Sequence, residues 1–238
     1  MYHTHFNSIH STQIYLRDNL VELKNHDHEI LISASEQTLG VGRKGSQWDA
    51  YEHAITMSFT LKPNPVPTLT PIEIGVLTSQ FIKQEYGEMI LLKWPNDLLT
   101  TEGKKCGGIL AQYIDSETVI AGLGLNLGPL PLMEIPSHYK HGLGQVSQKL
   151  KLSEVDKKEI PARLYSYLLK NRIQDSYEMQ KRFKEACFHI NNTVEIDDDG
   201  FHYEGIFLGI GLNGEALVEI DGQTRAFLSS SLKILGKA

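Results

Sequence analysis

The chain has 238 residues, of which 41% are hydrophobic and 22% are charged, and its formal net charge is −6. This composition is typical of a globular protein and argues against a disordered or collagen-like chain. The acidic balance argues against a general nucleic-acid surface, which needs an excess of Lys and Arg to neutralise phosphates. The two cysteines form no CxxC motif, so they indicate neither a disulfide framework nor a zinc site, and they fit a reducing compartment.

The N-terminus, MYHTHFNSIH, lacks the charged start and the apolar core of a signal peptide. No apolar run is as long as the roughly 20 residues needed to span a membrane. We therefore expect a cytoplasmic protein with no membrane partner. His3 and His5, like His26 and His28, have an alternate-residue spacing, but no carboxylate or third histidine stands at ligand spacing nearby, so we interpret all four as surface residues.

The first third of the chain predicts a helix and two strands around a glycine-rich loop. Ser11 and Thr12 precede leucines at helical spacing, which predicts a helix capped by one of the two hydroxyls. Residues 29–35 and 54–61 are apolar runs typical of buried strands.

The loop between these strands, QTLGVGRKGSQW at 37–48, suits an anion. Glycine lets main-chain N–H groups approach a ligand closely, and Arg43 offers a planar fork of donors. Trp48 adds a flat face on which a heterocycle can stack. A mobile surface loop with two solvated charges explains this stretch, taken alone, about equally well.

The next helix is marked at both ends. Thr70, Pro71 and Glu73 have the pattern of a hydroxyl cap, a first-turn proline and a capping-box carboxylate, and Gly87 marks the end. A short strand is predicted at 89–92, and the motif KWPND follows it directly.

KWPND, at 93–97, predicts a rigid polar turn, because proline constrains the residue before it. A plain turn would explain Pro-Asn-Asp, but not the preceding lysine and tryptophan. Two adjacent strands follow at 105–113 and 118–127. Their interior glycines suggest that a ligand or a second backbone packs against them.

The C-terminal half predicts a loop over 130–151 and a helical segment over 153–187 in which Pro161 marks a start or a kink. From residue 192, short β-rich runs alternate with the turns DDDG, LNG and DG, which predicts a small all-β barrel of four or five strands. We place the domain boundary near 187–191.

Together these motifs resemble the biotin protein ligase family, enzymes that activate biotin with ATP and attach it to a lysine of a biotin carboxyl carrier protein, an acetyl-CoA carboxylase subunit. The motifs are, in chain order, Ser11-Thr12-Gln13, GVGRKGS with Trp48, KWPND at 93–97, KKCGGIL at 104–110 and GLGLN at 122–126.

The resemblance implies an α+β fold: a mixed β-sheet flanked by helices, as in a class II synthetase-like catalytic domain, over 1–189, and an SH3-like β-barrel over 190–238. Only ten residues precede Ser11. The chain therefore resembles the short form of the family, which lacks an N-terminal DNA-binding domain, and we expect no DNA partner. The resemblance leaves a homodimer open.

The resemblance also implies roles for individual residues. Catalysis would fall to Lys105 and Arg43, with Asp97 orienting Lys105 or a metal, although no metal ligands are assigned. The implied ATP-binding residues are Arg43, Trp48, Asn96, Lys105 and Asn126. The implied biotin-binding residues are Ser11, Thr12, Gln13, Gln37, Gly40, Gly42, Arg43, Lys105, Gly107 and Gly108.

Three positions depart from the family pattern. Gln13 stands where the family has asparagine, and Val41 and Ser46 each stand where it has arginine. Fewer cations are therefore available to hold phosphates and to order the loop.

The chemistry implied by the resemblance needs cations more than nucleophiles. A carboxylate must approach the α-phosphorus of ATP, so the catalyst positions two anions and neutralises growing charge. Arg43, Lys105 and Mg²⁺ are the available cations. In the transfer step the carrier lysine must attack as a neutral amine, at a cost of about 4 to 5 kcal/mol at neutral pH. The residues do not identify the base, and Asp97 is the nearest candidate.

Two alternatives stay open. A lipoate or octanoyl ligase-like enzyme would share the fold and the acyl-transfer logic, with a pocket for a long chain. A non-catalytic biotin or nucleotide binder would be compatible with the missing loop arginines. Biotin-dependent release of pyrophosphate would distinguish a ligase from a binder.

Overall fold

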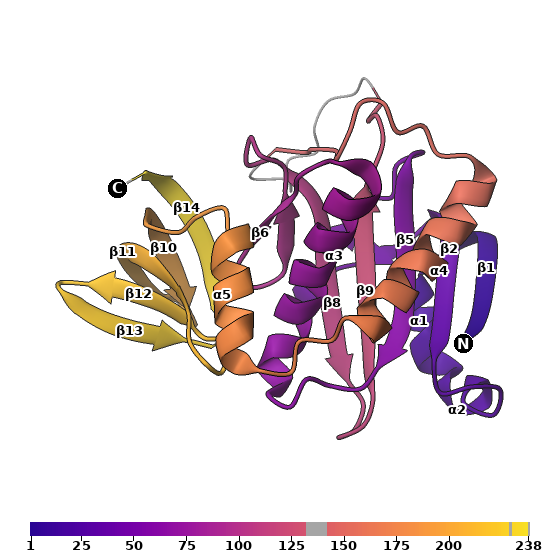
Figure 1. Ribbon diagram of the computed structural model, residues 1–238, viewed down its shortest axis with the longest axis horizontal. Helices are drawn as coiled ribbons and strands as arrows, with labels where there is room; N and C mark the ends of the chain where they lie inside the picture. Colours follow the sequence, from indigo (N-terminus) through magenta and orange to yellow (C-terminus); the bar gives the residue numbers. More distant parts are fainter. Residues whose placement is uncertain (132–141, 229, 238) are drawn as a thin grey trace.

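The computed structural model describes residues 1–131, 142–228 and 230–237 (Figure 1). Part of the loop expected over 130–151 therefore lies outside the described residues. Two β-sheets dominate the molecule, and helices cover the larger one on both faces. Within the described ranges, no helix is both long and apolar enough to cross a membrane.

The larger sheet has seven strands in the order β1-β2-β5-β9-β8-β7-β6. Strands β1 and β2 are parallel, and the other neighbours are antiparallel, so the predicted mixed sheet is confirmed. In chain order the strands are β1 (Tyr2–Ile9), β2 (Ile30–Gln37), β5 (Ala54–Leu61), β6 (Leu91–Lys93), β7 (Asp97–Leu99), β8 (Lys105–Tyr113) and β9 (Val119–Asn126).

Helices α3 (Thr70–Tyr86) and α4 (Glu154–Lys170) lie across one face of this sheet, and α1 (Thr12–Asp18) and α2 (Leu20–Leu23) lie behind the other (Figure 1). Alternate residues of β9 explain the two layers, because successive side chains of a strand point to opposite faces. Val119, Ala121, Leu123 and Leu125 join the main core, whereas Ile120 packs with the leucines of α1 and α2.

The second sheet has five antiparallel strands in the order β13-β12-β11-β10-β14. Its strands are β10 (Asn192–Asp198), β11 (Phe201–Ile210), β12 (Ala216–Ile220), β13 (Gln223–Phe227) and β14 (Ser231–Lys237). The expected strands are thus present, but the edge strands β13 and β14 do not pair with each other in the described residues, so no closed barrel is seen. Helix α5 (Ser176–Ala186) lies between the two sheets (Figure 1).

Helix α3 begins at Thr70 with Pro71 in its first turn, as predicted, but its predicted side-chain caps are wrong. A short 3-10 turn (Pro67–Leu69) runs directly into the helix, so Leu69 occupies the cap position and no side chain caps it. The Thr70 hydroxyl instead accepts a hydrogen bond from the Asn64 N–H. Glu73, fully buried, accepts two hydrogen bonds from Arg172 and one from the Ile173 N–H.

That buried carboxylate also explains why 153–187 is two helices and not one. The chain bends after Lys170 to bring Arg172 and Ile173 to Glu73, and Asp175 then caps α5 by accepting from the Glu178 N–H at 2.8 Å. Pro161 lies inside α4, seven residues after its first residue, and its side chain is buried.

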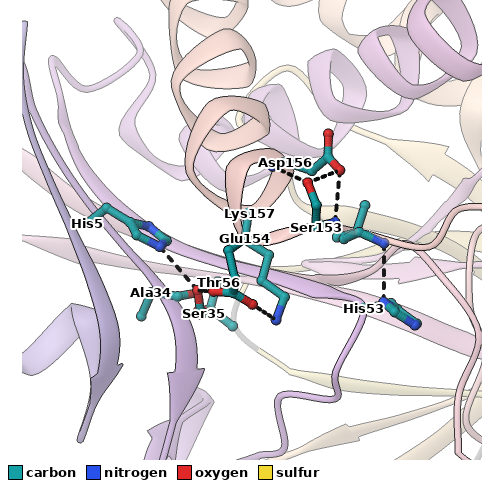
Figure 2. Close-up of polar contacts among 10 residues, drawn as sticks. His5, Ala34, Ser35, His53, Thr56, Ser153, Glu154, Asp156 and Lys157 are labelled. Atoms are coloured by element: carbon teal, nitrogen blue, oxygen red, sulfur yellow. Dashed lines mark hydrogen bonds and ion pairs between the residues drawn. The ribbon is translucent and has the colours of Figure 1, made fainter.

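Strand β1, which no sequence pattern predicted, brings His3 and His5 under α4. His3 Nε2 and His5 Nδ1 each lie 2.8 Å from Ser33 Oγ, and both imidazoles are half-buried, so the prediction of surface residues is wrong for this pair. Figure 2 shows how the contacts continue: His5 meets Ser35, which donates to Glu154 at the start of α4. His26 and His28 are exposed, as predicted.

Candidate active site

A cavity of about 290 Å³ opens on the face of the larger sheet that carries α1. Its floor is made by β8 and β9, its walls by the start of α1, the glycine-rich loop and the KWPND turn, and one rim by the start of β14 in the second sheet. Most of the residues predicted from the resemblance line this cavity: Ser11, Thr12, Gln13, Gln37, Gly42, Arg43, Trp48, Asn96, Asp97, Lys105 and Gly108.

Glycines keep the floor of the cavity open. Gly108 and Gly124 pair across β8 and β9, and Gly122 lies two residues before Gly124 in β9. A Cβ at Gly124 would come within 2.3 Å of the Trp48 indole, and one at Gly122 within 2.8 Å of Gln13 Oε1. We predicted a ligand or a second backbone against these glycines; at Gly122 and Gly124 the structure instead places the side chains of Gln13 and Trp48.

Neutral polar groups gather at the Gly122 part of the cavity. Gln37 Oε1 accepts hydrogen bonds from both the N–H and the hydroxyl of Thr12, whose oxygen also lies 2.9 Å from Ser58 Oγ. Gln13 Nε2 donates to the Ile120 carbonyl, while its Oε1, although buried, has no hydrogen-bond partner. A buried polar atom normally has a partner, so this end of the cavity suits a ligand with an N–H donor.

The glycine-rich loop folds into a small hairpin, β3 (Gly40–Val41) and β4 (Gln47–Trp48), with a 3-10 turn at Arg43–Gly45. Gly45 has a φ of +75°, a conformation that favours glycine. The hairpin aims Arg43 at the KWPND turn, where its Nη1 donates to Asn96 Oδ1 at 2.8 Å.

Asn96 is fixed at both ends of its side chain. Its oxygen accepts from Arg43, and its Nδ2 donates to the Ile109 carbonyl at 2.7 Å. In this structure Asn96 therefore ties the loop to β8, and its implied contact with adenine stays a prediction.

The charged end of the cavity lies near Gly108, where one carboxylate is shared by two lysines. Asp97 Oδ1 is 2.6 Å from Lys105 Nζ, and Asp97 Oδ2 is 3.3 Å from Lys93 Nζ. Burial by itself would raise the pKa of Asp97, but the two ammonium groups outweigh burial and hold that pKa below its ordinary value. Asp97 is thus an anion across the neutral pH range, and it orients Lys105.

Three of the residues implied by the resemblance do not line the cavity. Gly40 packs against the Trp48 carbonyl, Gly107 faces the Gly124 carbonyl, and Asn126 donates through Nδ2 to the Gly144 carbonyl. Asn126 Oδ1 and Trp48 Nε1 are buried without a hydrogen-bond partner.

Sequence reasoning missed several lining residues. Lys93 lies inside the KWPND motif but carries no implied role, and Ser58 looks like an ordinary strand residue. Ser230, Ser231 and Leu232 come from the second sheet, and nothing in their sequence marks them as part of a site.

Metal-ligating side chains are not concentrated here. Among the described residues, no group of three or more His, Cys, Asp or Glu side chains is placed to hold a metal ion. Both cysteines are free, and burial raises the pKa of each thiol to about 12, so neither is an activated nucleophile.

Residues 5–126 match the model of the Biotin/lipoate A/B protein ligase family, which is about half of the chain and includes every motif of the cavity except the rim from the second sheet. The chain belongs to this family.

Individual relatives in this family include biotin ligases. The Escherichia coli protein "Bifunctional ligase/repressor BirA" is 24% identical over 240 residues, covering 95% of this chain and 72% of that protein. A Mycobacterium tuberculosis biotin–acetyl-CoA-carboxylase ligase is 31% identical over 110 residues, covering 43% of this chain and 41% of that protein. A solved structure, biotin protein ligase from Aquifex aeolicus with biotin and ATP, superposes with a TM-score of 0.78 at 23% identity over 98% of this chain and 99% of that chain. The last likeness establishes a shared fold.

Proposed function

We propose that this chain activates biotin with ATP to biotinyl-5'-AMP and then transfers biotin to a lysine of a biotin carboxyl carrier protein. One observation carries the proposal: a single cavity has neutral hydrogen-bonding groups around Gly122 and cations around Gly108. Gly108 lies opposite Gly124, two residues from Gly122, so the two positions are diagonal neighbours across β8 and β9, about 7 to 8 Å apart. A ligand with a ureido ring at one end and a carboxylate at the other matches this division.

At the ring end, the free Gln13 Oε1 is an acceptor for a ureido N–H. Gln37 Oε1 already accepts twice, so its Nε2 is the atom left to donate to a ureido carbonyl. This polar lining favours a bicyclic urea over the alkyl chain of lipoate or octanoate, because burying these amides against methylenes would leave them unpaired.

At the charged end, Lys105 and Arg43 face the reacting groups. A biotin carboxylate oxygen attacks the α-phosphorus, a new O–P bond forms, and pyrophosphate leaves with the electron pair of the broken P–O bond. The two cations offset the repulsion between these anions and stabilise the charge that grows in the transition state. In the second step the carrier's amine attacks the acyl carbon, AMP leaves, and the nitrogen loses one proton.

Mg²⁺ is part of the proposal as a companion of ATP. Asp97 is the carboxylate nearest the reacting groups, and both its oxygens already contact ammonium groups. The residues that the structure describes therefore do not form a resident metal site, and we place the ion on the phosphates of the nucleotide, which it would help to neutralise.

We assign residues 1–189 to the catalytic unit and 190–238 to a second unit that closes one rim of the cavity, because the second sheet begins at Asn192. The two free thiols support a cytoplasmic location. A homodimer and the absence of DNA binding stay predictions.

The test is a mass measurement on a recombinant carrier domain incubated with the protein, biotin, ATP and Mg²⁺. We expect the mass of one biotinyl group to be added, and no addition when biotin or ATP is left out. Lipoate in place of biotin serves as the competing substrate. Pyrophosphate release without carrier labelling would reject the carrier, and labelling by lipoate alone would favour the lipoate ligase alternative.

A further inference from the structure

Lys93 is a buried cation in the cavity wall that the proposed chemistry does not use. It ends strand β6, its side chain is only 8% exposed, and it lines the cavity. Enclosing an ammonium group is costly unless it is paired. In the described part of the chain its carboxylate partner is Asp97, at 3.3 Å.

The backbone holds this pair together. Lys93 and Asp97 are register partners in the tight β6–β7 hairpin, so the hairpin holds their backbones side by side. Lys105 differs in both respects. It lies on β8, beside an irregularity in the β7–β8 register, and its side chain is 28% exposed. Asp97 thus has one fixed partner and one partner that is free to turn toward the cavity.

When Lys105 turns to a ligand anion, Asp97 loses its shorter contact of 2.6 Å. A buried carboxylate left without a cation is strongly destabilised, and it would either take up a proton or pull Lys105 back. Lys93 removes that conflict, because Asp97 keeps one ammonium group throughout.

We propose that Lys93 is a positioning residue that keeps Asp97 ionised and in place while Lys105 exchanges between Asp97 and the carboxylate or phosphate of the substrates. The inference rests on the proposed function. It assigns Lys93 a part in adenylate formation through Asp97, with no contact to the substrate.

The charged and titratable groups around this pair are few. Lys93 comes from β6 and Lys105 from β8. Arg43 reaches the same turn through Asn96, and the Cys106 thiol interacts electrostatically with Asp97. His189 also interacts electrostatically with Lys93. Burial and, to a smaller extent, the charge of Lys93 lower the pKa of His189 to about 3, so its imidazole stays neutral near pH 7. Asp97 is therefore the group whose ionised form Lys93 supports, and losing Lys93 would raise the Asp97 pKa from its lowered value.

The experiment compares Lys93→Met, Lys93→Arg and the matched control Lys62→Met, whose lysine forms an exposed pair with Glu117 at 2.7 Å. Biotin-dependent exchange of pyrophosphate into ATP is measured against pH. For Lys93→Met we expect kcat to fall about tenfold or more, while KM for biotin and ATP changes less than about threefold. The acid limb of the pH–rate profile should move up by about 1 pH unit or more, because a cation that lowers the Asp97 pKa is lost. Lys93→Arg keeps the charge and should keep the wild-type acid limb.

A second measurement separates positioning from direct contact. In an Asp97→Asn background, Lys93→Met should change the exchange rate less than about twofold, since its effect passes through the carboxylate. A full loss in that background would overturn the inference, as would a Lys93→Met enzyme with wild-type kcat and pH profile. If Lys93→Met does not fold, the test rests on Lys93→Arg. A folded Lys93→Arg enzyme whose acid limb differs from that of the wild type would also overturn the inference. Wild-type protein without biotin-dependent exchange would instead reject the proposed function.

Discussion

Asp97 lies within 3.3 Å of two lysines in the cavity, and the role of each side chain can be tested by its own substitution. Lys105 is the more exposed of the two lysines that pair with Asp97, and in the proposed chemistry it is the cation that meets the reacting oxygens. Lys105→Ala should leave the fold intact and lower adenylate formation by about 10² to 10³, the usual value of a positioned cation or donor. Pyrophosphate release is the measurement, with circular dichroism as the check on folding. A folded variant with near-wild-type release would show that Lys105 has another role.

Gly124 tests whether Trp48 covers a nucleotide base. A Cβ there would lie 2.3 Å from the indole, so Gly124→Ala must displace Trp48. We expect KM for ATP to rise about tenfold and KM for biotin to change little, because the ring end of the cavity is two strand residues away. Gly214→Ala would not be a suitable control, since its φ is +78°. Ala121→Gly, on the opposite face of β9, is the better one. An equal rise in both KM values would place Trp48 over biotin.

At the scale of elements, the glycine-rich hairpin has lost two of the family's arginines, and Arg43 is the arginine that remains in it. Ordering such a loop costs about 1 to 2 kcal/mol per residue, which charge-assisted contacts help to offset. Val41→Arg with Ser46→Arg should slow the dissociation of biotinyl-adenylate, most visibly at low salt, where exposed charges are least screened. Off-rates matching wild type at both low and high salt would show that other residues already compensate.

The histidines of strand β1 pack against β2 and reach helix α4 through Ser35, so this packing should weaken in acid. Burial, then His5 and Lys158, lower the pKa of His3 to about 4, and burial lowers that of His5. A histidine whose pKa is lowered by folding adds stability at pH values above its pKa in the unfolded chain, about 6.5. This stability is lost as the pH falls toward its pKa in the folded protein.

Between pH 7.5 and 5.5 the wild type should therefore lose about 1 kcal/mol more than a His3→Gln, His5→Gln double variant, after allowing for partial exposure. Urea midpoints at the two pH values measure this difference. His189 is present in both proteins and cancels. Equal losses would mean that the β1 contact does not depend on these imidazoles.

At the scale of the whole molecule, one hydrophobic core runs through both sheets, since Phe59 of the larger sheet and Phe207 of the smaller belong to the same buried cluster. The KWPND turn is also joined to the second sheet's chain segment, because Trp94 Nε1 donates a hydrogen bond to the Gly214 carbonyl at 2.9 Å. The two sheets should therefore unfold in a single transition.

Trp94→Phe removes that hydrogen bond and leaves a carbonyl unpaired, at a cost of about 1 to 3 kcal/mol. In a chain of this length each kcal/mol lowers Tm by about 2 to 4 °C. Differential scanning calorimetry should show one lowered peak, and the exposed Tyr177→Phe should show none of this change. Two separated peaks in wild type would contradict the shared core.

The sequence by itself determined the elements whose signals are local. Periodic leucines and the Ser11-Thr12 pair predicted the first helix, which Ser11 caps, Gly87 ended α3 at the expected residue, and strand β5 spans the predicted residues. The family motifs also identified most of the residues that line the cavity, because each motif is a short local stretch of sequence.

Only the tertiary structure decided what depends on partners far along the chain. Glu73 looked like a helix cap until Arg172, about a hundred residues later, was found to bind it. Strand β1 exists because β2 provides its hydrogen-bonding edge, and Lys93 became part of the site because a hairpin and β8 bring two ammonium groups to one carboxylate. Pairing energy between distant residues leaves no periodicity in the sequence, so these features could be seen only in the folded molecule.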